Sequence, residues 1–338
     1  MPIQSINLII KLTDKCNMKC QFCSASNLDT HDMSKDDVCR VIDSLNEKFA
    51  VKSISLEGGE PTSIGIKAFT EIVEEVSKRY PDIGSIGMTT NLWNFYKRPE
   101  VWTEIFRHPL LDICTSFQYG NKRRFSETKI LDEQTFRRMY DLFKTQVGKP
   151  LPFISVIDED NEDSVLKTVL LAKELNTSCK INPTLPQGRS TVYYPIHKMI
   201  EKWADIICSG LGQYEDNCRY LIDAVKGNTT SLSCPFNHNC TTLYACDNLG
   251  RLTTCSIYRD YHSTVKFYDK KIMNPKKDPF MSVLKPECYT CDKFDICNGC
   301  RVHIGATKTY SDVETHCESV KQSYDRILRF LNEQNNTN

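Results

Sequence analysis

The chain has 338 residues, and its 43 Lys and Arg balance 43 Asp and Glu, so the formal net charge is zero. Such a balance gives no long-range field to attract nucleic acid or an anionic membrane, and we expect neither as a partner. Hydrophobic residues make up 40% and charged residues 25%, as in ordinary globular proteins. The basic run Lys122-Arg123-Arg124 is interpreted as a solvated loop, with docking of an acidic peptide segment as the alternative.

The cysteine content is unusual, because 17 cysteines are too many for an ordinary cytosolic enzyme. A disulfide framework needs an oxidising compartment, but Met1–Leu8 has neither the basic segment nor the apolar core of a secretory signal. No apolar run reaches the ~18 residues of a membrane-spanning helix. The sequence therefore predicts a cytoplasmic protein whose thiols are reduced or bind metal.

Strand-like and helical patterns alternate over the first two thirds of the chain. Apolar runs predict strands at 6–12, 52–56, 84–89, 112–118, 153–157 and 179–181. Helical spacing predicts helices at 34–49, 66–76, 99–106, 136–147, 164–175 and 195–210. The first helix should begin with a capping pair, Ser34 and Asp37. Six successive strand–helix units favour parallel strands joined by right-handed crossovers.

Three cysteines follow the first predicted strand in a C-x3-C-x2-C array, Cys16, Cys20 and Cys23. Thiolates this close on one loop can converge on one metal centre, and sulfur ligation suits zinc or an iron–sulfur cluster. Three protein ligands leave the fourth position of the centre open. We therefore expect a group that is not protein to bind there.

The second predicted strand ends in Gly58-Gly59-Glu60-Pro61, where glycines allow close approach to the backbone and proline fixes the turn. Together with the aromatic Phe22 of the cysteine array, this segment resembles the radical S-adenosylmethionine (SAM) enzymes. The resemblance implies that the three thiolates hold a four-iron cluster, whose open iron takes the amino and carboxylate groups of SAM. It also implies that Gly58, Gly59 and Glu60 lie against the methionyl amino group. In that family the reduced cluster cleaves SAM to methionine and a 5′-deoxyadenosyl radical.

Two further side chains match the family at predicted strand ends. Asn91 stands where the third strand of the family often ends in Thr-Asn, and Ser116 matches a fourth-strand serine that contacts the SAM carboxylate in relatives. The usual S-x-D-G has Gln118 here in place of the acid. Asn91 and Ser116 are thus candidate cofactor contacts, with a turn residue and a buried hydroxyl as the alternatives. All these motifs follow strands, and a barrel carries its active face at the strand ends.

A second field of cysteines fills the C-terminal third, where ten of the 17 lie between Cys218 and Cys317. So loop-rich a segment would be built around metal rather than around an apolar core. Its spacings resemble the SPASM extension of radical SAM peptide and protein maturases, which carries two auxiliary four-iron clusters. The final C-x2-C pair departs from the family, which usually has three intervening residues.

The resemblance to sulfatase maturases implies two complete four-thiolate sets. The first auxiliary cluster would be held by Cys234, Cys240, Cys255 and Cys300. The second would be held by Cys288, Cys291, Cys297 and Cys317. Closed sets of this kind favour electron transfer over substrate ligation. Cys246 is an extra thiol that could replace Cys234 or Cys240, and a zinc ribbon is the alternative for Cys288–Cys300.

The expected fold class is α/β, a partial (β/α)6 TIM-like barrel with a small, loop-rich, cysteine-rich iron–sulfur domain and a C-terminal helix. The expected boundaries are 1–212 for the barrel, 213–233 for a linker or helix, 234–318 for the SPASM domain, and 319–338 for the C-terminal helix and tail. Because the first strand begins near Ile6, we expect no leader-binding domain before it.

The implied function is that of a radical SAM oxidoreductase that matures a ribosomal precursor peptide. A 5′-deoxyadenosyl radical would remove hydrogen from a side-chain or backbone carbon, and a crosslink or other oxidation would follow. Ser256 stands where anaerobic sulfatase maturases have an aspartate base, which disfavours formylglycine formation. The cofactors would be SAM and three 4Fe–4S clusters, and the electron donor would be of the flavodoxin or ferredoxin type. The alternatives are a radical SAM dehydrogenase or rearrangement enzyme acting on a sugar or nucleoside, and a non-enzymatic metal-binding module.

Overall fold

The computed structural model describes residues 4–23, 31–186, 189–227, 242–253, 291–293 and 313–336. The chain forms two compact units. The first comprises Met1–Ile154, Pro186–Thr191 and Cys240–Phe267, and the second comprises Ser155–Leu185, Val192–Asn239 and Tyr268–Asn338. The predicted domain boundaries therefore stay a prediction, since most of 234–312 lies outside the described residues.

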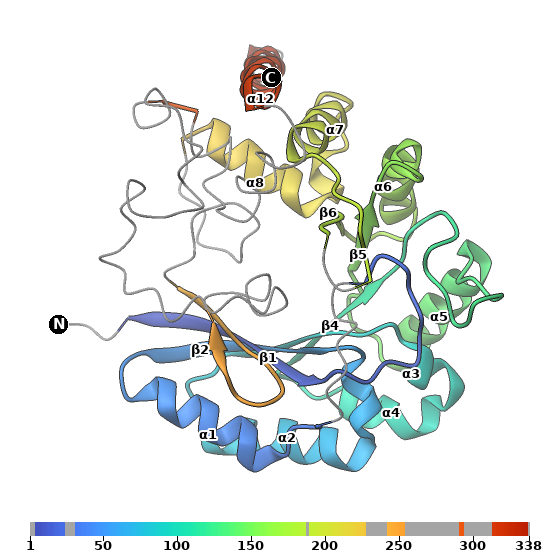
Figure 1. Ribbon diagram of the computed structural model, residues 1–338, viewed down its shortest axis with the longest axis vertical. Coiled ribbons are helices and arrows are strands. Elements are labelled where there is room, and N and C mark those ends of the chain that lie inside the picture. The colour runs from blue at the N-terminus through green and yellow to red at the C-terminus, as the bar shows by residue number, and fades with distance from the viewer. Residues whose placement is uncertain are drawn as a thin grey trace. The chain divides into compact units, whose positions relative to one another are not determined.

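Eight strands follow the order β6-β5-β4-β3-β2-β1-β7-β8 (Figure 1). They are β1 Ser5–Thr13, β2 Ala50–Gly58, β3 Ser85–Thr89, β4 Leu111–Ser116, β5 Phe153–Ile157, β6 Cys179–Pro183, β7 Leu243–Cys246 and β8 Leu252–Thr253. From β1 to β5 each strand pairs in parallel with the next in sequence. The six predicted strands and their parallel pairing confirm the α/β class and the partial TIM-like barrel.

The helices alternate with these strands as the sequence predicts. They are α1 Lys35–Asn46, α2 Ile66–Arg79, α3 Trp93–Lys97, α4 Pro99–Phe106, α5 Glu133–Gln146, α6 Val165–Glu174, α7 Ile196–Cys208, α8 Asp216–Val225 and α12 Val313–Asn336, with a 3-10 turn, η1, at Pro61–Ile64. All six predicted helices are confirmed. The short helix α3 was missed, and α8 lies where we expected a linker or helix.

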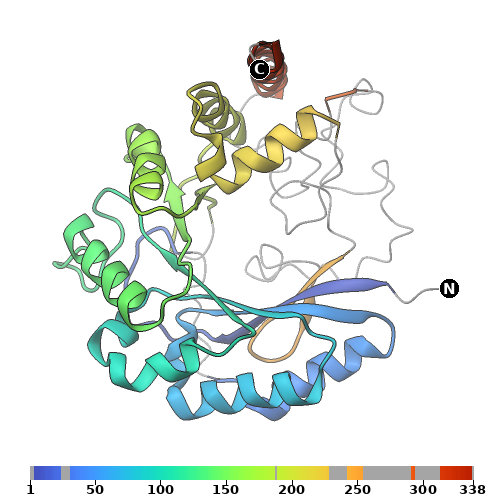
Figure 2. The same cartoon turned by 180° about the vertical axis from the view of Figure 1, so that it is seen from behind.

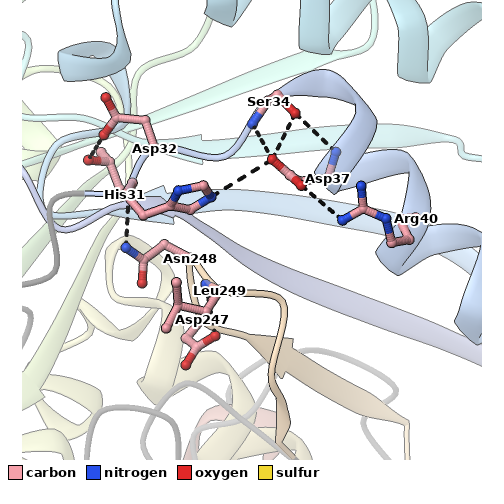
Figure 3. Close-up of polar contacts among 9 residues, drawn as sticks. His31, Asp32, Ser34, Asp37, Arg40, Asp247, Asn248 and Leu249 are labelled. Carbon is pink, nitrogen blue, oxygen red and sulfur yellow. Dashed lines mark hydrogen bonds and ion pairs between the residues drawn. The ribbon is translucent and has the colours of Figure 1, made fainter.

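The predicted capping pair at the start of α1 is confirmed (Figure 3). The Asp37 amide donates to Ser34 Oγ at 3.2 Å, and the Ser34 amide donates to Asp37 Oδ2 at 2.9 Å. Arg40 pairs with the other Asp37 oxygen at 2.9 Å. These hydrogen bonds lower the pKa of Asp37, because they favour its ionised form. The cap fixes the first turn of α1, which is the first helix after the cysteine loop.

In the first unit the strands divide their side chains between an apolar and a polar face. Leu8, Ile10, Leu56 and Ile86 share one face by their register and are at most 1% exposed. The helices α1 and α2 cover one face of the strands in both views (Figure 2). Side chains alternate along a strand, so the opposite face carries the intervening residues. Apart from Ile9 and Gly87 these are polar or small side chains, and we call them the polar face: Asn7, Lys11, Ser53, Ser55, Glu57, Ser85, Thr89, Asp112, Cys114 and Ser116.

The strand β7 was not predicted, and it comes from the part of the sequence that we assigned to the cysteine-rich domain. It pairs in parallel with β1, with Cys246 opposite Ile10. The side chain of Cys246 is fully buried. In the following turn, Asn248 Nδ2 donates to the carbonyl of His31 at 2.8 Å (Figure 3). This segment of the first unit thus holds the chain just before α1.

In the second unit, α12 packs along α7 and begins before residue 319, where we expected the C-terminal helix and tail to start. Val320 and Ile327 of α12 are at most 1% exposed. Arg326 Nη1 lies 2.6 Å from Asp205 Oδ1 of α7, and Ser319 Oγ donates to the Glu201 carboxylate. The predicted C-terminal helix is therefore confirmed, with α7 as its packing partner.

The second unit also buries a carboxyl group, that of Glu215, at the start of α8. Its oxygens accept hydrogen bonds from the amides of Ile181 at 2.8 Å and Cys218 at 2.6 Å. Burial raises the pKa of Glu215 to about 7, although these hydrogen bonds oppose the shift. The folded protein therefore keeps this proton over a pH range in which the unfolded chain has lost it.

We expect the stability of the second unit to decrease as the pH rises from 5 to just above 7. The carboxyl protonates more readily in the folded state, so the free energy of unfolding should drop by about 3 kcal/mol over this range and then level off. Urea unfolding followed by circular dichroism at several pH values measures this slope. The control is Glu215→Gln, which cannot titrate and should show a flatter profile; identical slopes in the two proteins would contradict the assignment.

Candidate metal centre and cofactor site

The three predicted metal ligands lie on the loop that follows β1. Cys20 is buried and Cys23 is half-buried, whereas Cys16 is exposed as a residue. The Cys16 sulfur nevertheless has protein around it, and its pKa is raised to about 12, first by loss of water and then by the Glu60 carboxylate and the Cys23 and Cys20 thiols. The Met18 amide donates to Cys16 Sγ at 3.4 Å and opposes this shift. The three thiols therefore share one electrostatic environment, in which only a nearby cation would favour the thiolates.

Two segments hold the cysteine loop through backbone hydrogen bonds. On one side the Gly59 amide donates to Thr13 O and the Glu60 amide to Lys15 O, both at 2.8 Å. On the other side the Lys19 amide donates to Arg124 O at 2.7 Å, and the Gln21 amide donates to Lys122 O at 2.9 Å. Asp32 adds two side-chain contacts, because it accepts from Thr13 Oγ1 and pairs with Lys15, each at 2.6 Å. The loop is thus fixed to the ends of β1 and β2 and to the segment after β4.

Gly58 and Gly59 are needed for this attachment. A Cβ on Gly58 would stand 2.6 Å from Thr13 O, and one on Gly59 would stand 2.5 Å from Lys15 O and 2.6 Å from Asp14 O. No real Cβ approaches backbone so closely. The glycines therefore allow close approach of the cysteine loop itself, a reason that differs from the ligand contact we inferred from the sequence.

We expect Gly59→Ala to weaken iron binding at the cysteine loop while the barrel stays folded. The added methyl group must displace the Asp14–Lys15 backbone, which costs about 1–3 kcal/mol where packing is tight. Iron and labile sulfide per chain measure the loss, and circular dichroism measures the fold. Gly87→Ala on β3 is the matched control, because its Cβ would meet nothing nearer than 3.6 Å. Full iron content in Gly59→Ala would contradict the prediction.

Glu60, a predicted cofactor contact, is 1% exposed and holds the ends of β2 and β3 together. Its Oε1 accepts from Thr62 Oγ1 at 2.6 Å and Thr90 Oγ1 at 2.7 Å, and its Oε2 accepts from the Asn91 amide at 2.7 Å. Burial raises the pKa of Glu60, while these hydrogen bonds favour its ionised form. The carboxyl group therefore has a structural partner on each oxygen, and its contact with a cofactor stays a prediction.

Asn91 belongs to a closed ring of side-chain hydrogen bonds that the sequence did not reveal. Asn91 Nδ2 donates to Asn17 Oδ1 at 2.7 Å, and Asn17 Nδ2 donates to Asn94 Oδ1 at 2.9 Å. Asn94 Nδ2 donates to Thr62 Oγ1 at 2.9 Å, which leads back to Glu60 and from Glu60 to the Asn91 amide. The ring connects the residue after Cys16 to β3, α3 and η1. It therefore adds side-chain support to the cysteine loop.

Arg123 is the main correction to the sequence interpretation, because it is 5% exposed and not part of a solvated run. Its Nη1 donates to Ser116 Oγ at 2.8 Å, and its guanidinium lies 5.1 Å from the centre of the Phe22 ring. Its Nε is buried without a hydrogen-bond partner, as is Gln118 Oε1. No carboxylate of the described residues pairs with Arg123. The structure thus brings together a buried cation, the predicted Ser116 and the predicted Phe22 beside the cysteine loop.

Most of the predicted auxiliary ligands lie outside the described residues. These are Cys234, Cys240, Cys255, Cys288, Cys297 and Cys300. Cys291 and Cys317, which is on α12, are described and half-buried, and both stay predicted ligands. Within the described part of the chain, no three His, Cys, Asp or Glu side chains are grouped to hold one metal ion, and this holds for Cys16, Cys20 and Cys23, which stay predicted ligands. None of its helices is both long and apolar enough to cross a bilayer.

Three thiols lie on the loop after a strand of the partial barrel, and a buried cation lies beside that loop. The family model described as Radical SAM superfamily matches residues 10–185, more than half of the chain. The chain therefore belongs to the radical SAM superfamily. Membership implies a SAM-binding site and a 4Fe–4S cluster, and the residues present fit both groups. Three thiols suit a cluster with one open iron, and the unpaired Arg123 suits a carboxylate.

The sequence relatives include a molybdenum cofactor biosynthesis protein and GTP 3',8-cyclases. Molybdenum cofactor biosynthesis protein moc-5 of Caenorhabditis elegans is 25% identical over 273 residues, which are 73% of this chain and 43% of that protein. The GTP 3',8-cyclase of Psychromonas ingrahamii is 29% identical over 99 residues, 28% of each chain. The chain thus spans less than half the length of these relatives.

Two solved structures have the same fold over most of the chain. Native anSMEcpe with bound AdoMet and Cp18Cys peptide has a TM-score of 0.72 and 20% identity, covering 99% of this chain and 100% of that one. Streptococcus suis SuiB bound to precursor peptide SuiA has a TM-score of 0.60 and 17% identity, covering 91% and 74%. At these identities the likeness concerns the fold.

Proposed function

We propose that this protein is a radical SAM peptide maturase. Cys16, Cys20 and Cys23 would hold the cluster, which supplies the electron that cleaves SAM when both are bound. The protein contributes by binding and orienting the cofactor and by keeping water from the reactive carbon. The ring of hydrogen bonds through Asn17 and the backbone contacts of Gly59 support this role, since both fix the geometry of the cysteine loop.

We assign the SAM carboxylate to Arg123 and Ser116. A guanidinium with a buried, unpaired Nε is costly unless an anion binds beside it, and a carboxylate matches its planar fork. Ser116 Oγ, already 2.8 Å from Arg123, can donate its own hydrogen to the same anion. Phe22, Gly58, Gly59, Glu60 and Asn91 stay proposed cofactor contacts, of which Glu60 and Asn91 would act mainly through the backbone that they position.

The peptide substrate is supported by the fold match over nearly the whole chain to anSMEcpe with a bound peptide, and this is the observation that carries the proposal. SuiB with its precursor peptide supports the same class of substrate. The polar face is compatible with it, because hydroxyl and amide groups dominate this surface and can bind peptide groups by hydrogen bonds.

A nucleotide substrate is the second candidate, favoured by the likeness to GTP 3',8-cyclases. A triphosphate needs several cations or backbone amides around it. Among its charged members, the polar face has two carboxylates, Glu57 and Asp112, against one ammonium group, Lys11, which pairs with Asp14. This charge balance disfavours a triphosphate on the polar face of the first unit.

We further propose two auxiliary clusters of the SPASM type, with the four-thiolate sets expected from the sequence. The burial of Cys246 in β7 supports Cys234 and Cys240 as ligands in its place. Complete thiolate sets have no open position, so these clusters would accept an electron from the substrate radical without binding the substrate.

The test uses protein that is purified and reconstituted without oxygen. It is incubated with SAM, a reductant and either short peptides encoded beside its gene or GTP, and products are analysed by mass spectrometry. We expect 5′-deoxyadenosine and a peptide that is lighter by the mass of two hydrogens, as a crosslink requires. Conversion of GTP with all the peptides unchanged would replace this proposal by the second candidate.

A further inference from the structure

A group of cations and aromatic rings lies next to the cysteine loop, on α3 and on the segment after β4. The Trp93 ring packs on Phe125 at 4.2 Å and on Tyr96 at 5.7 Å between ring centres. Lys97 Nζ lies 4.7 Å from the centre of the Trp93 ring, and Lys129 Nζ lies 5.8 Å from it and 5.5 Å from that of Phe125. These cation–π contacts hold two ammonium groups at fixed positions on a half-buried aromatic base.

This group is continuous with the loop that carries the cluster ligands. The backbone of Lys19, between Cys16 and Cys20, donates to the carbonyl of Arg124, whose neighbour Phe125 packs on Trp93. We define the cationic patch by these cations and rings: Lys19, Lys97, Arg124, Lys129, Trp93, Tyr96 and Phe125. It lies one hydrogen bond from the cysteine loop.

The patch keeps its positive charge. Among the described residues, no carboxylate pairs with Lys19, Lys97, Arg124 or Lys129, and Lys19, Lys97 and Lys129 are exposed. Arg124 uses its guanidinium to donate to the backbone carbonyl of Glu127, whose carboxylate is the acidic group of the same turn. The chain as a whole is neutral, and although Lys129 interacts with the Asp132 carboxylate, whose pKa it lowers, these cations outnumber the carboxylates around them and leave a local positive potential that attracts an acidic partner.

We infer that the cationic patch is the docking surface for an acidic one-electron carrier protein. The inference rests on the proposed function, because that function needs one electron at the cluster for each cleavage of SAM. The reduced carrier would lose one electron to the cluster held by Cys16, Cys20 and Cys23, with no bond formed or broken at the surface. Encounters between electron-transfer proteins use small, transient interfaces, and opposite charges steer the two partners together.

An acidic peptide substrate fits the same charge but not the same geometry. Along Lys122–Phe125, Arg123 turns inward to Ser116 and Phe22, while Arg124 and Phe125 form the patch. A peptide on the patch would therefore be separated from Ser116 and the polar face by this segment. An electron donor needs to approach the cysteine loop without entering the site, and the patch allows that approach.

The test compares the double variant Lys97→Glu, Lys129→Glu with the control Lys35→Glu, Lys67→Glu. The control residues lie in the first turns of α1 and α2, outside the patch, and change the net charge equally. Binding of oxidised flavodoxin to the holoenzyme is measured by calorimetry at low and high salt. We expect binding about tenfold weaker for the patch variant at low salt, no difference at high salt, and no change for the control.

A second readout is SAM cleavage with dithionite, a small reductant that needs no docking surface. The patch variant should cleave SAM with dithionite as fast as the unchanged protein does, yet more slowly with reduced flavodoxin. Equal flavodoxin binding by the patch variant and the control would overturn the inference. So would a loss of peptide affinity in the patch variant, which would assign the patch to the substrate. If the unchanged protein fails to cleave SAM with dithionite, the proposed function fails. The binding comparison then still tests whether the patch is the docking surface of the electron carrier.

Discussion

Replacement of Cys16, Cys20 and Cys23 together by alanine is expected to abolish 5′-deoxyadenosine formation completely. The three thiols share one loop and one electrostatic environment, and the described residues offer no other group of side chains to hold iron. Iron and sulfide analysis should show the loss of one cluster per chain, with the iron of the proposed auxiliary clusters retained. Chromatography of the reaction with SAM and dithionite measures the nucleoside.

The matched control for this variant is Cys39→Ala. Cys39 is a buried thiol of α1 that belongs to neither predicted set of ligands, so its replacement should change stability without changing iron content. Retained 5′-deoxyadenosine in the triple variant would refute the site, whatever its iron content. Loss of all iron would instead mean that the three clusters depend on one another for assembly.

The barrel could be predicted from the sequence because its signal is local. Each strand is an apolar run, and each helix repeats its apolar residues every three to four positions. These elements can therefore be predicted without knowing which distant residues they contact. Ser34 and Asp37 likewise act within one turn. The cysteine array and Gly58-Gly59-Glu60-Pro61 are local in the same sense, and the family match over residues 10–185 agrees with them.

The features that were missed depend on contacts between distant segments. Asn17 and Asn94 are ordinary polar residues in sequence, and only the fold brings them within 2.9 Å. The strand β7 has four residues, which are too few for a periodic signal. It forms because its backbone pairs with the edge of β1. Arg123 was hidden by its neighbours, since a run of three basic residues suggests solvent, whereas the bend after β4 brings its side chain to Ser116 and Phe22.

Replacement of Arg123 by glutamine should weaken SAM binding by about thirtyfold, because a hydrogen-bonded charge pair contributes about 2 kcal/mol. The iron content should not change, since no backbone contact of the cysteine loop depends on this side chain. The dissociation constant of SAM is measured by its effect on the electron paramagnetic resonance spectrum of the reduced cluster. Arg123→Lys keeps the charge but not the planar fork, and an intermediate affinity is expected from it.

The neighbouring Arg124→Gln provides the control for position, because its guanidinium contacts the Glu127 carbonyl and not Ser116. It should bind SAM as the unchanged protein does. If Arg123→Gln and Arg124→Gln bind SAM equally well, the carboxylate lies elsewhere and the burial of Arg123 has another cause. If Arg123→Gln also loses iron, its stacking on Phe22 supports the cysteine loop directly, and the cofactor assignment has to rest on Ser116 alone. A thirtyfold effect at full iron content is the result that requires an anion beside Arg123, because a purely structural side chain would not change affinity while leaving the cluster intact.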